Sequence, residues 1–277
     1  VRFAQNMSQP IRELMTKINL ITAEEGISRK KALDILHSNK IEKLIVIDKE
    51  KRCVGLITVT DIKKSEKYPL ATKDNIGRLR VAAAVGVGKD GLNRAENIYN
   101  AGADAIVLDT AHAHSKRVID TVKSIRKIVK NNIQVIAGNI ATKEAAKLLL
   151  KQKVDAIKIG IGPGSICTTR IIAGVGVPQF SAITEIYEAT KKSKIPLIAD
   201  GGIRYSGDVA KAIGAGADCV MIGSLLAGTQ ESPGEVFLYQ GRSYKSYRGM
   251  GSIAAMEKGS SDRYFQQDVQ DRLKFVP

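Results

Sequence analysis

A lone cysteine in a glycine-rich loop is the first feature of this sequence that could do chemistry. The stretch "KIGIGPGSICTTR", residues 158–170, places three glycines and a proline before Cys167 and two threonines after it. Glycine adopts backbone conformations that other residues avoid, so the amides or carbonyls of such a loop can converge on one point. Partial exposure and amide contacts favour the thiolate, which is the nucleophilic form of cysteine. We therefore expect Cys167 to attack an electrophile on a bound ligand.

The other two cysteines indicate no second reactive site. Cys53 and Cys219 lie in apolar runs, where a free cysteine is usually a small buried side chain. No CxxC pair is present, so neither a disulfide framework nor a zinc site is predicted, and a reducing cytosol fits this cysteine usage. No apolar run approaches the roughly 18 residues that a membrane span needs. The sequence therefore predicts a cytoplasmic protein without a membrane partner.

Two further glycine motifs suit a phosphate group. "ADGGIR" contains Asp200, Gly201 and Gly202, and "MIGSLLAG" contains Gly223 and Ser224 at a predicted helix start. Adjacent glycines expose backbone amides and a helix N-terminus carries partial positive charge, so together they form a cradle for an anion. Asp200 could accept hydrogen bonds from a ribose diol. Each motif alone is also an ordinary turn, but two of them on neighbouring loops favour nucleotide binding.

Polar residues also end two earlier apolar runs. "LDTAHAHS" contains Asp109, which could bind the ribose of a second nucleotide, and His112, which could stack or hydrogen-bond nearby. "IAGN" ends in Asn139, which is either an amide donor or a turn residue. His112 and His114 lack a third ligand at suitable spacing, so we do not expect a metal site there.

The formal net charge of +15 raises the question of a nucleic-acid partner. The lysines are scattered over predicted helix faces such as "TVKSIRKIVKNN", and the sequence has no arginine-rich arm and no basic stripe interleaved with aromatics. We therefore do not expect nucleic-acid binding, and the charge instead favours a small anionic ligand such as a nucleotide.

Six apolar runs separated by helix-periodic segments must position these residues. The runs span residues 79–87, 104–110, 133–139, 155–162, 195–202 and 218–224. Continuous apolar runs between helices are typical of parallel strands buried on both faces. The pattern predicts an α/β fold, namely a (β/α)8 TIM barrel, in which catalytic residues lie at the carboxyl ends of the strands. An open doubly wound sheet is the alternative that the pattern favours less. Because a barrel needs eight strands, we expect the first two to precede Val1 in a longer parent chain.

The N-terminal region has a different order of predicted helices and strands. Residues 8–68 predict a helix, two strands and a helix, and the end of this unit, with Thr58, Thr60 and Asp61, resembles the closing signature of a nucleotide-binding CBS module. A strand end followed by a helix N-cap is the alternative interpretation of these residues. We expect residues 1–70 to hold the tail of a first CBS copy and a second copy, inserted into the barrel. Residues 71–277 then form the catalytic barrel portion, including the start of an active-site flap.

Five motifs in order carry a family resemblance, namely "GIGPGSICTTR", "ADGGIR", "MIGSLLAG", "YRGMGS" and "DRYF". With the CBS-like insertion before the barrel, they closely resemble the bacterial inosine 5′-monophosphate dehydrogenase family, and the resemblance covers essentially the whole chain. It implies an oxidoreductase of purine biosynthesis that catalyses the committed step of guanine nucleotide (GMP) synthesis. The implied reaction is NAD-dependent oxidation of inosine monophosphate to xanthosine monophosphate through a covalent cysteine thioimidate, followed by hydrolysis.

The resemblance also implies roles for individual residues. Cys167 matches the nucleophile, and Arg263 and Tyr264 match a mobile flap pair whose arginine activates water, with Thr169 as an accessory proton carrier. The positions that match substrate contacts are Ser165, Asp200, Gly201, Gly202, Gly223, Ser224, Tyr247, Arg248, Gly249, Met250 and Gly251.

Further matches concern the cofactor and a metal ion. The positions on the NAD side are Asp109, His112, Asn139, Gly160, Ile161 and Gly162. The carbonyls of Gly162, Gly164 and Cys167 match a potassium site that a neighbouring subunit completes, and the resemblance implies a homotetramer. Purine nucleotides are possible ligands of the CBS-like unit.

Two alternatives remain. Guanosine monophosphate reductase shares the cysteine loop and the phosphate sites, but it lacks the CBS insertion and the Arg-Tyr flap, and it releases ammonia rather than adding water. A second alternative is a catalytically incompetent nucleotide-binding fragment, because the chain ends within the expected flap.

Overall fold

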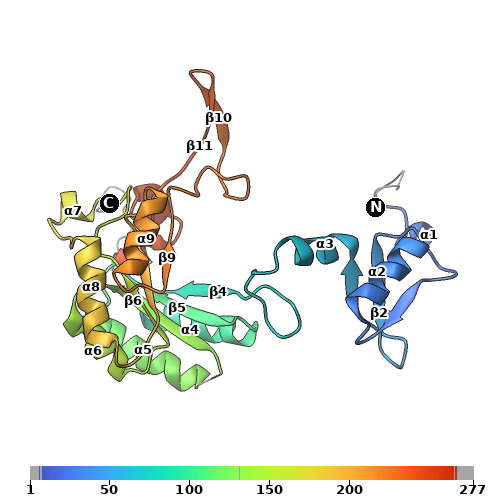
Figure 1. The fold of residues 1–277 in the computed structure, drawn as a ribbon, viewed down its shortest axis with the longest axis horizontal. Coiled ribbons are helices and arrows are strands. Elements are labelled where there is room, and N and C mark those ends of the chain that lie inside the picture. Colours follow the sequence, from blue (N-terminus) through green and yellow to red (C-terminus); the bar gives the residue numbers. More distant parts are fainter. Residues whose placement is uncertain (1–5, 7, 131, 265, 267–277) are drawn as a thin grey trace. The chain divides into compact units, whose positions relative to one another are not determined.

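The computed structural model describes residues 6, 8–130, 132–264 and 266, and Figure 1 shows their arrangement. The chain divides into two compact units, Val1–Leu79 and Arg80–Pro277. This division falls later in the chain than the boundary after residue 70 that the sequence suggests.

The first unit is a small α/β structure. Its elements are α1 (Ile11–Leu14), β1 (Thr22–Glu24), α2 (Arg29–Ser38), β2 (Lys43–Ile47), β3 (Cys53–Thr58) and α3 (Val59–Lys67). The strands form one sheet in the order β1-β2-β3, in which β1 pairs parallel and β3 pairs antiparallel with β2. Leu36 of α2, Leu44 of β2 and Ile62 of α3 share one buried core. The order α2-β2-β3-α3 is the helix, strand, strand, helix predicted from the sequence.

Thr58 and Asp61 bond to each other at the start of α3. The Thr58 hydroxyl accepts from the Asp61 amide at 3.1 Å and donates to Asp61 Oδ2 at 2.6 Å, while the Thr58 amide donates to the same oxygen at 3.2 Å. This reciprocal arrangement is a capping box, which satisfies amides that the first helical turn leaves unpaired. Both side chains therefore have a local role as a helix cap.

The second unit is built on a parallel sheet. Its strands are β4 (Ala82–Val85), β5 (Ala105–Asp109), β6 (Gln134–Ile140), β7 (Ala156–Ile159), β8 (Leu197–Asp200) and β9 (Cys219–Met221). The helices between them are α4 (Gly88–Asn100), α5 (Lys116–Val129), α6 (Lys143–Lys151), α7 (Thr169–Ile172), α8 (Gln179–Thr190) and α9 (Ser206–Gly214). All pairs are parallel and the spatial order follows the chain order from β4 to β9. The six predicted apolar runs are these six strands.

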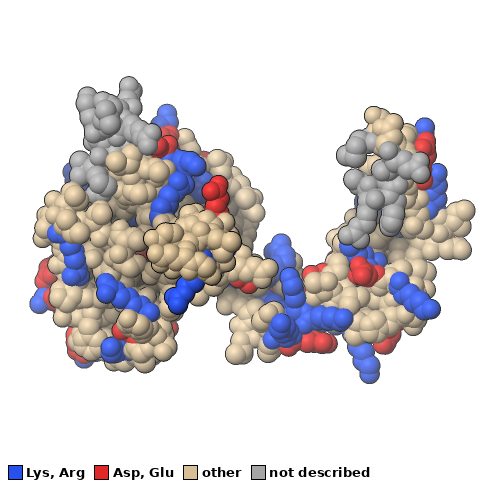
Figure 2. All heavy atoms as spheres, turned by 90° about the horizontal axis from the view of Figure 1, so that it is seen from above, with Lys and Arg blue, Asp and Glu red and all other residues tan. Residues whose placement is uncertain are grey.

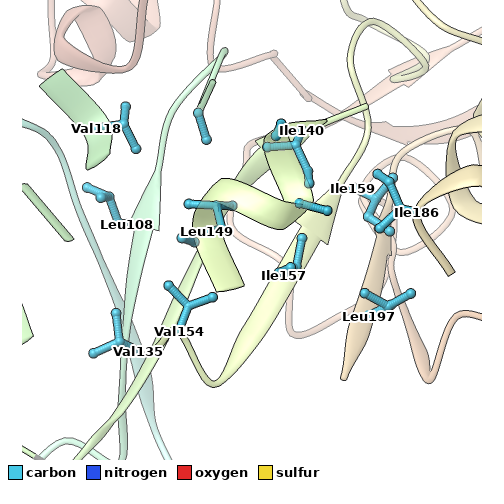
Figure 3. Close-up of a cluster of buried hydrophobic side chains, with 14 of the residues drawn as sticks. Leu108, Val118, Val135, Ile140, Leu149, Val154, Ile157, Ile159, Ile186 and Leu197 are labelled. Atoms are coloured by element: carbon cyan, nitrogen blue, oxygen red, sulfur yellow. The ribbon is translucent and has the colours of Figure 1, made fainter. Parts of the chain in front are cut away.

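Apolar periodicity explains how strands and helices pack in this unit. All four residues of β7 are buried, as expected of a strand covered on both faces. On α5, Val118, Val122, Ile125 and Val129 recur at the spacing of one helix face, and all four are fully buried. Figure 3 shows part of this core, with Leu149 of α6 and Ile157 of β7 among the buried side chains.

Side-chain caps fix where two of these helices begin. The Ser115 hydroxyl accepts from the Val118 amide at 3.3 Å, and the Thr142 hydroxyl accepts from the Ala145 amide at 3.4 Å. Both residues directly follow the loops that leave the carboxyl ends of β5 and β6. These caps therefore help to set the length of the loops that carry candidate site residues.

A hairpin and two short helices follow β9. Their bounds are β10 (Val236–Tyr239), β11 (Arg242–Lys245), α10 (Ile253–Met256) and the 3₁₀ helix η1 (Ser260–Tyr264). The antiparallel β10–β11 hairpin extends away from the sheet in Figure 1. The chain then returns to the sheet, since the Ala111 amide donates to the Arg263 carbonyl at 3.0 Å.

These features confirm the predicted fold class. The curled parallel sheet with helices on its outside is part of a (β/α)8 barrel, and the described strands leave β4 and β9 as its two edges. One prediction is wrong: Cys53 and Cys219 are exposed, because both lie on edge strands of their sheets. Among the described residues, no helix is long and apolar enough to cross a membrane. On the face shown in Figure 2, basic and acidic side chains occur on both units.

Candidate active site

Tight backbone approach shapes the loop that follows β7. Gly160 has φ 146°, and a Cβ atom there would lie 2.1 Å from the Asp200 carbonyl oxygen at the end of β8. Gly162 has φ 79°, a left-handed conformation that favours glycine. The glycines in this stretch therefore let the loop run directly against the neighbouring strand end.

Arg170 holds this loop from outside. Its Nε donates to the Gly162 carbonyl at 2.8 Å, and its Nη2 donates to the Val177 carbonyl at 2.9 Å. Two hydrogen bonds from one planar guanidinium fix the two segments relative to each other. Arg170 was given no role from the sequence, although it ends the motif that contains Cys167.

Cys167 lies on the wall of a cavity of about 340 Å³. Its amide donates to the Gly164 carbonyl at 3.1 Å, and its Sγ lies 3.2 Å from the Thr169 hydroxyl oxygen. The thiol is half-buried, so a ligand in the cavity can reach it. The predicted site residues that line this cavity are Asn139, Gly160, Ile161, Gly162, Gly164, Cys167, Thr169, Asp200, Gly201, Tyr247, Arg248, Gly249, Met250, Gly251, Arg263 and Tyr264.

A smaller cavity of about 120 Å³ shares a wall with the first one. It collects the remaining predicted substrate positions, which are Ser165, Gly202, Gly223 and Ser224. A Cβ atom at Gly223 would lie 2.6 Å from the Tyr247 hydroxyl, so glycine is needed for the tyrosine to approach this turn. The structure thus brings every predicted substrate position into two adjoining cavities.

The carboxyl ends of four neighbouring strands meet at Lys158 of β7. Its ammonium nitrogen lies 2.8 Å from Asp109 Oδ1 of β5 and 2.5 Å from Asp200 Oδ2 of β8, and it donates to Asn139 Oδ1 of β6. The Asn139 amide nitrogen in turn donates to the Gly160 carbonyl at 2.8 Å and to Asp200 Oδ2 at 3.0 Å. Lys158 is 2% exposed, so this polar cluster lies in the barrel interior.

Asp109 also contacts Arg263 of the 3₁₀ helix η1. Its Oδ2 pairs with Nη1 of Arg263, and the Ala111 amide bonds the main chain of the same residue. Asp109 and Arg263 both line a third cavity of about 560 Å³ beside β4. The expected cofactor position and the expected water-activating arginine are thus in contact.

His112 lies after β5 and is not among the residues lining these three cavities. Its ring centroid is 6.1 Å from that of His114. Within the described part of the chain, no group of three or more His, Cys, Asp or Glu side chains could hold a metal ion. A histidine metal site is therefore not part of the described structure.

Burial acts on both cations of the site. It lowers the pKa of Lys158, and the nearby Asp200 carboxylate partly opposes this shift. It also lowers the pKa of Arg263, while Tyr264 acts in the opposite direction. Pairing with Asp109 adds a second influence that favours the charged guanidinium. Burial is thus the largest influence on the pKa of Arg263, and it disfavours the charged guanidinium.

Sequence reasoning missed two residues besides Arg170. Lys158 could have been noticed as a charged residue inside an apolar run, because lysine is rarely buried without partners. Gln179 donates to the Ile159 and Asp200 carbonyls at 2.9 and 3.2 Å, and so joins the ends of β7 and β8. It is adjacent to a proline at the start of a helix and gives no comparable signal in the sequence.

The fold and the site together define a class: parallel α/β barrel proteins with a cysteine on the loop after one strand and a nucleotide-sized cavity beside it. Residues 27–277 match the IMP dehydrogenase / GMP reductase domain, and the chain belongs to this family. The inosine-5'-monophosphate dehydrogenase of Rhizobium tropici is 57% identical over 277 residues, which cover 100% of this chain and 55% of the relative. The inosine-5'-monophosphate dehydrogenase of Helicobacter pylori (strain ATCC 700392 / 26695) is 58% identical, and the match covers 100% of this chain and 56% of the relative.

A solved structure is also similar. The crystal structure of GMP reductase C318A from Trypanosoma brucei in complex with guanosine 5'-monophosphate superposes with a TM-score of 0.81 at 40% identity. The match covers 94% of this chain and 54% of that one. The chain thus spans about half the length of the curated relatives it matches.

Proposed function

We propose that the full-length protein is an inosine monophosphate dehydrogenase, which oxidises inosine monophosphate to xanthosine monophosphate with NAD. One observation carries the proposal: Cys167, Thr169, Asp200 and Arg263 line a single cavity. A nucleophile, a ribose-binding carboxylate and a flap arginine are the groups that this reaction needs together.

The substrate would occupy both adjoining cavities. The small cavity offers the backbone of Gly202, Gly223 and Ser224 and the Ser165 side chain to the phosphate. Asp200, which lines both cavities, would accept from the ribose hydroxyls. The purine would then lie in the larger cavity against Cys167 and the 247–251 turn.

In the first step the Cys167 sulfur adds to C2 of the purine, and the hydrogen on C2 leaves with its electron pair. NAD, when bound, accepts this hydride. The Cys167 thiol donates to the Thr169 hydroxyl at 3.2 Å, and this hydroxyl would pass the thiol proton on to solvent water. The product is a thioimidate that joins Cys167 to C2 of the substrate.

The second step hydrolyses this adduct. Water bonds to C2, the C2–S bond breaks, and the Cys167 sulfur is released with a proton. Arg263 would take the proton from water, which requires its neutral form. Burial in the docked position lowers the pKa of Arg263 in the direction that this role needs. Thr169 and Tyr264, which line the same cavity, would assist the transfer.

Asp109 gives the two steps their order. One carboxylate oxygen is already taken by Lys158, and the other pairs with Arg263. If Asp109 also binds the cofactor ribose, Arg263 and the cofactor compete for the same oxygen. The residues proposed for the cofactor are Asp109, His112, Asn139, Gly160, Ile161 and Gly162. Arg263 would then dock on Asp109 and activate water only when that oxygen is free.

A potassium ion is proposed at the carbonyls of Gly162, Gly164 and Cys167. Carbonyl oxygens suit a hard cation, and the left-handed Gly162 lets successive carbonyls turn toward one another. Gly162 and Gly164 already accept hydrogen bonds from Arg170 and Cys167, so one lone pair on each remains. Three carbonyls are too few for such an ion, which is why we propose that a neighbouring subunit of a homotetramer supplies the rest.

We further propose that residues 1–70 contain a CBS module that binds purine nucleotides, and that residues 71–277 form the catalytic barrel portion. The α2-β2-β3-α3 order supports the module. A ligand at Thr58 and Asp61 would have to bind beside their capping box or open it. The protein is proposed to act in the cytoplasm, at the committed step of guanine nucleotide synthesis.

A product assay tests the proposed function. The full-length protein with inosine monophosphate and NAD is expected to form NADH and xanthosine monophosphate in equal amounts. The alternative, GMP reductase, fits the match to the Trypanosoma brucei structure at 40% identity, but the dehydrogenase relatives at 57 and 58% identity support the main proposal better. The reductase alternative predicts instead that guanosine monophosphate, supplied with a reduced nicotinamide cofactor, is reduced to inosine monophosphate with release of ammonia. A protein that binds the nucleotide but forms no product would support the catalytically incompetent alternative.

A further inference from the structure

We propose that Lys158 is a positioning residue that orients the substrate carboxylate Asp200 and the cofactor carboxylate Asp109 together. This inference rests on the proposed function, because that function assigns the two carboxylates to two different ligands. Neither the glycine motifs nor the cysteine chemistry accounts for a lysine in the barrel interior.

The contacts come from three different strands. Lys158 projects from β7 and meets Asp109 of β5, Asn139 of β6 and Asp200 of β8. A buried ion pair that only stabilises the fold needs one carboxylate. Here one ammonium group contacts two carboxylates on either side of its own strand, at 2.8 and 2.5 Å. Lys158 is therefore the one described side chain that joins the proposed substrate and cofactor carboxylates by direct ion pairs.

The contacts also determine which oxygen atoms are left for ligands. Lys158 forms an ion pair with Oδ1 of Asp109 at 2.8 Å that lacks hydrogen-bond geometry, and Oδ2 of Asp109 pairs with Arg263. Within the described part of the chain, Lys158 and Asn139 both contact Oδ2 of Asp200, which leaves Oδ1 for a ligand. Fixing one oxygen of each carboxylate fixes the direction of the other.

Charge and burial support the same role. The described ion-paired cluster joins two carboxylates to two cations, Lys158 on strand β7 and Arg263 in the 3₁₀ helix η1. When Arg263 leaves Asp109, Lys158 remains as the buried cation between the two carboxylates. At 2% exposure, its ammonium group has little access to water and depends on these partners. Lys158 thus contacts both carboxylates whether or not Arg263 is paired with Asp109.

A double-mutant cycle on ligand binding tests the proposal in the full-length protein. Cys167→Ala serves as background so that calorimetry measures binding without reaction. Lys158→Met is expected to weaken inosine monophosphate binding at least tenfold when Asp200 is present and less than twofold in Asp200→Asn. With inosine monophosphate saturating, the same substitution is expected to weaken NAD binding at least tenfold with Asp109 and less than twofold in Asp109→Asn.

Three comparisons keep the result decisive. Lys158→Arg retains charge and donors and should recover most of both affinities, while Lys147→Met, on the exposed side of α6, should change neither. If Lys158→Met does not fold, Lys158→Gln replaces it in the same cycle. Losses that persist in the Asn backgrounds, or affinities equal to those of the parent, would overturn the positioning role.

The proposed function is tested separately by the product assay. Coupling in the binding cycle without xanthosine monophosphate formation would refute the dehydrogenase and retain Lys158 as a positioning residue. Product formation without coupling would support the dehydrogenase and overturn the positioning role of Lys158.

Discussion

At the residue scale, the chemistry is divided between two side chains on one cavity. Cys167 is presented by a loop that is part of the barrel, and Arg263 comes from a segment that follows the β10–β11 hairpin. Their separate origins suit the proposed two-step reaction, in which the cysteine would act in both steps and the arginine only in the second. A substitution of Arg263 should therefore separate the steps.

Arg263→Ala in the full-length protein is expected to spare a single-turnover burst of NADH and to slow steady-state turnover about 10²–10⁴-fold, the usual worth of general-base help. Rapid-mixing absorbance at the NADH band measures both phases. Arg242→Ala, on the exposed strand β11, is the matched control and should leave both unchanged. Equal loss of burst and turnover in Arg263→Ala would remove the arginine from the water-activating step.

The sequence allowed Cys167, Asp200 and the glycine turns to be predicted, because each residue type has a local chemical reason to be in a loop. It did not reveal the partners of Lys158, since these lie on strands β5, β6 and β8 and meet only in the folded barrel. The contact between Asp109 and Arg263 could not be foreseen for the same reason. Their roles as cofactor and flap residues stay predictions.

At the element scale, the position of the cysteine loop depends on how closely it approaches β8. Gly160 packs against the Asp200 carbonyl, and Arg170 and Gln179 tie the loop and strand ends by side-chain hydrogen bonds. Displacing the loop should therefore affect the reaction more than the stability of the barrel.

Gly160→Ala tests this dependence. Its Cβ would lie 2.1 Å from the Asp200 carbonyl, so loop and strand must separate. We expect turnover to fall about 10²-fold, as for a reactive group displaced by about 1 Å, with a stability loss of about 1–3 kcal/mol. Gly214→Ala at the end of α9, where a Cβ meets nothing within 4 Å, is the control. Unchanged turnover in Gly160→Ala would contradict the proposed loop geometry.

The helices stabilise the sheet through residues such as Leu149, which is fully buried between α6 and the strands. Leu149→Ala is expected to lower the free energy of unfolding by about 2–5 kcal/mol, since it removes buried methyl groups and leaves a cavity. Denaturant unfolding measures the change. Lys147→Ala on the exposed side of the same helix should stay within about 0.5 kcal/mol. A similar loss in both variants would mean that burial of Leu149 is not the cause, since alanine itself has the highest helix propensity.

At the scale of the whole molecule, the strand order was predictable because continuous apolar runs between helices leave few topologies besides a parallel barrel sheet. The exposure of Cys53 and Cys219 could not be predicted, because an edge strand carries the same apolar pattern as a central strand. The compact units divide after Leu79, and a short antiparallel pairing joins Lys73 and Leu79 just before this point; the module boundary after residue 70 stays a prediction.

The proposed potassium site belongs to this scale because it needs a second subunit. Replacing potassium chloride by sodium chloride at equal ionic strength is expected to slow the full-length protein, and adding potassium back should restore its rate. The control is nucleotide binding by calorimetry, which should persist in both salts. Equal turnover in both salts would argue against a potassium-selective site at the Gly162, Gly164 and Cys167 carbonyls.

The most direct test of the central claim is mass spectrometry of the full-length protein quenched during turnover with inosine monophosphate and NAD. Our account predicts a purine nucleotide covalently bound to the peptide that contains Cys167, together with NADH and xanthosine monophosphate. It predicts neither adduct nor NADH in Cys167→Ala. NADH formation by Cys167→Ala, or an adduct on Cys53 or Cys219 in place of Cys167, would contradict it.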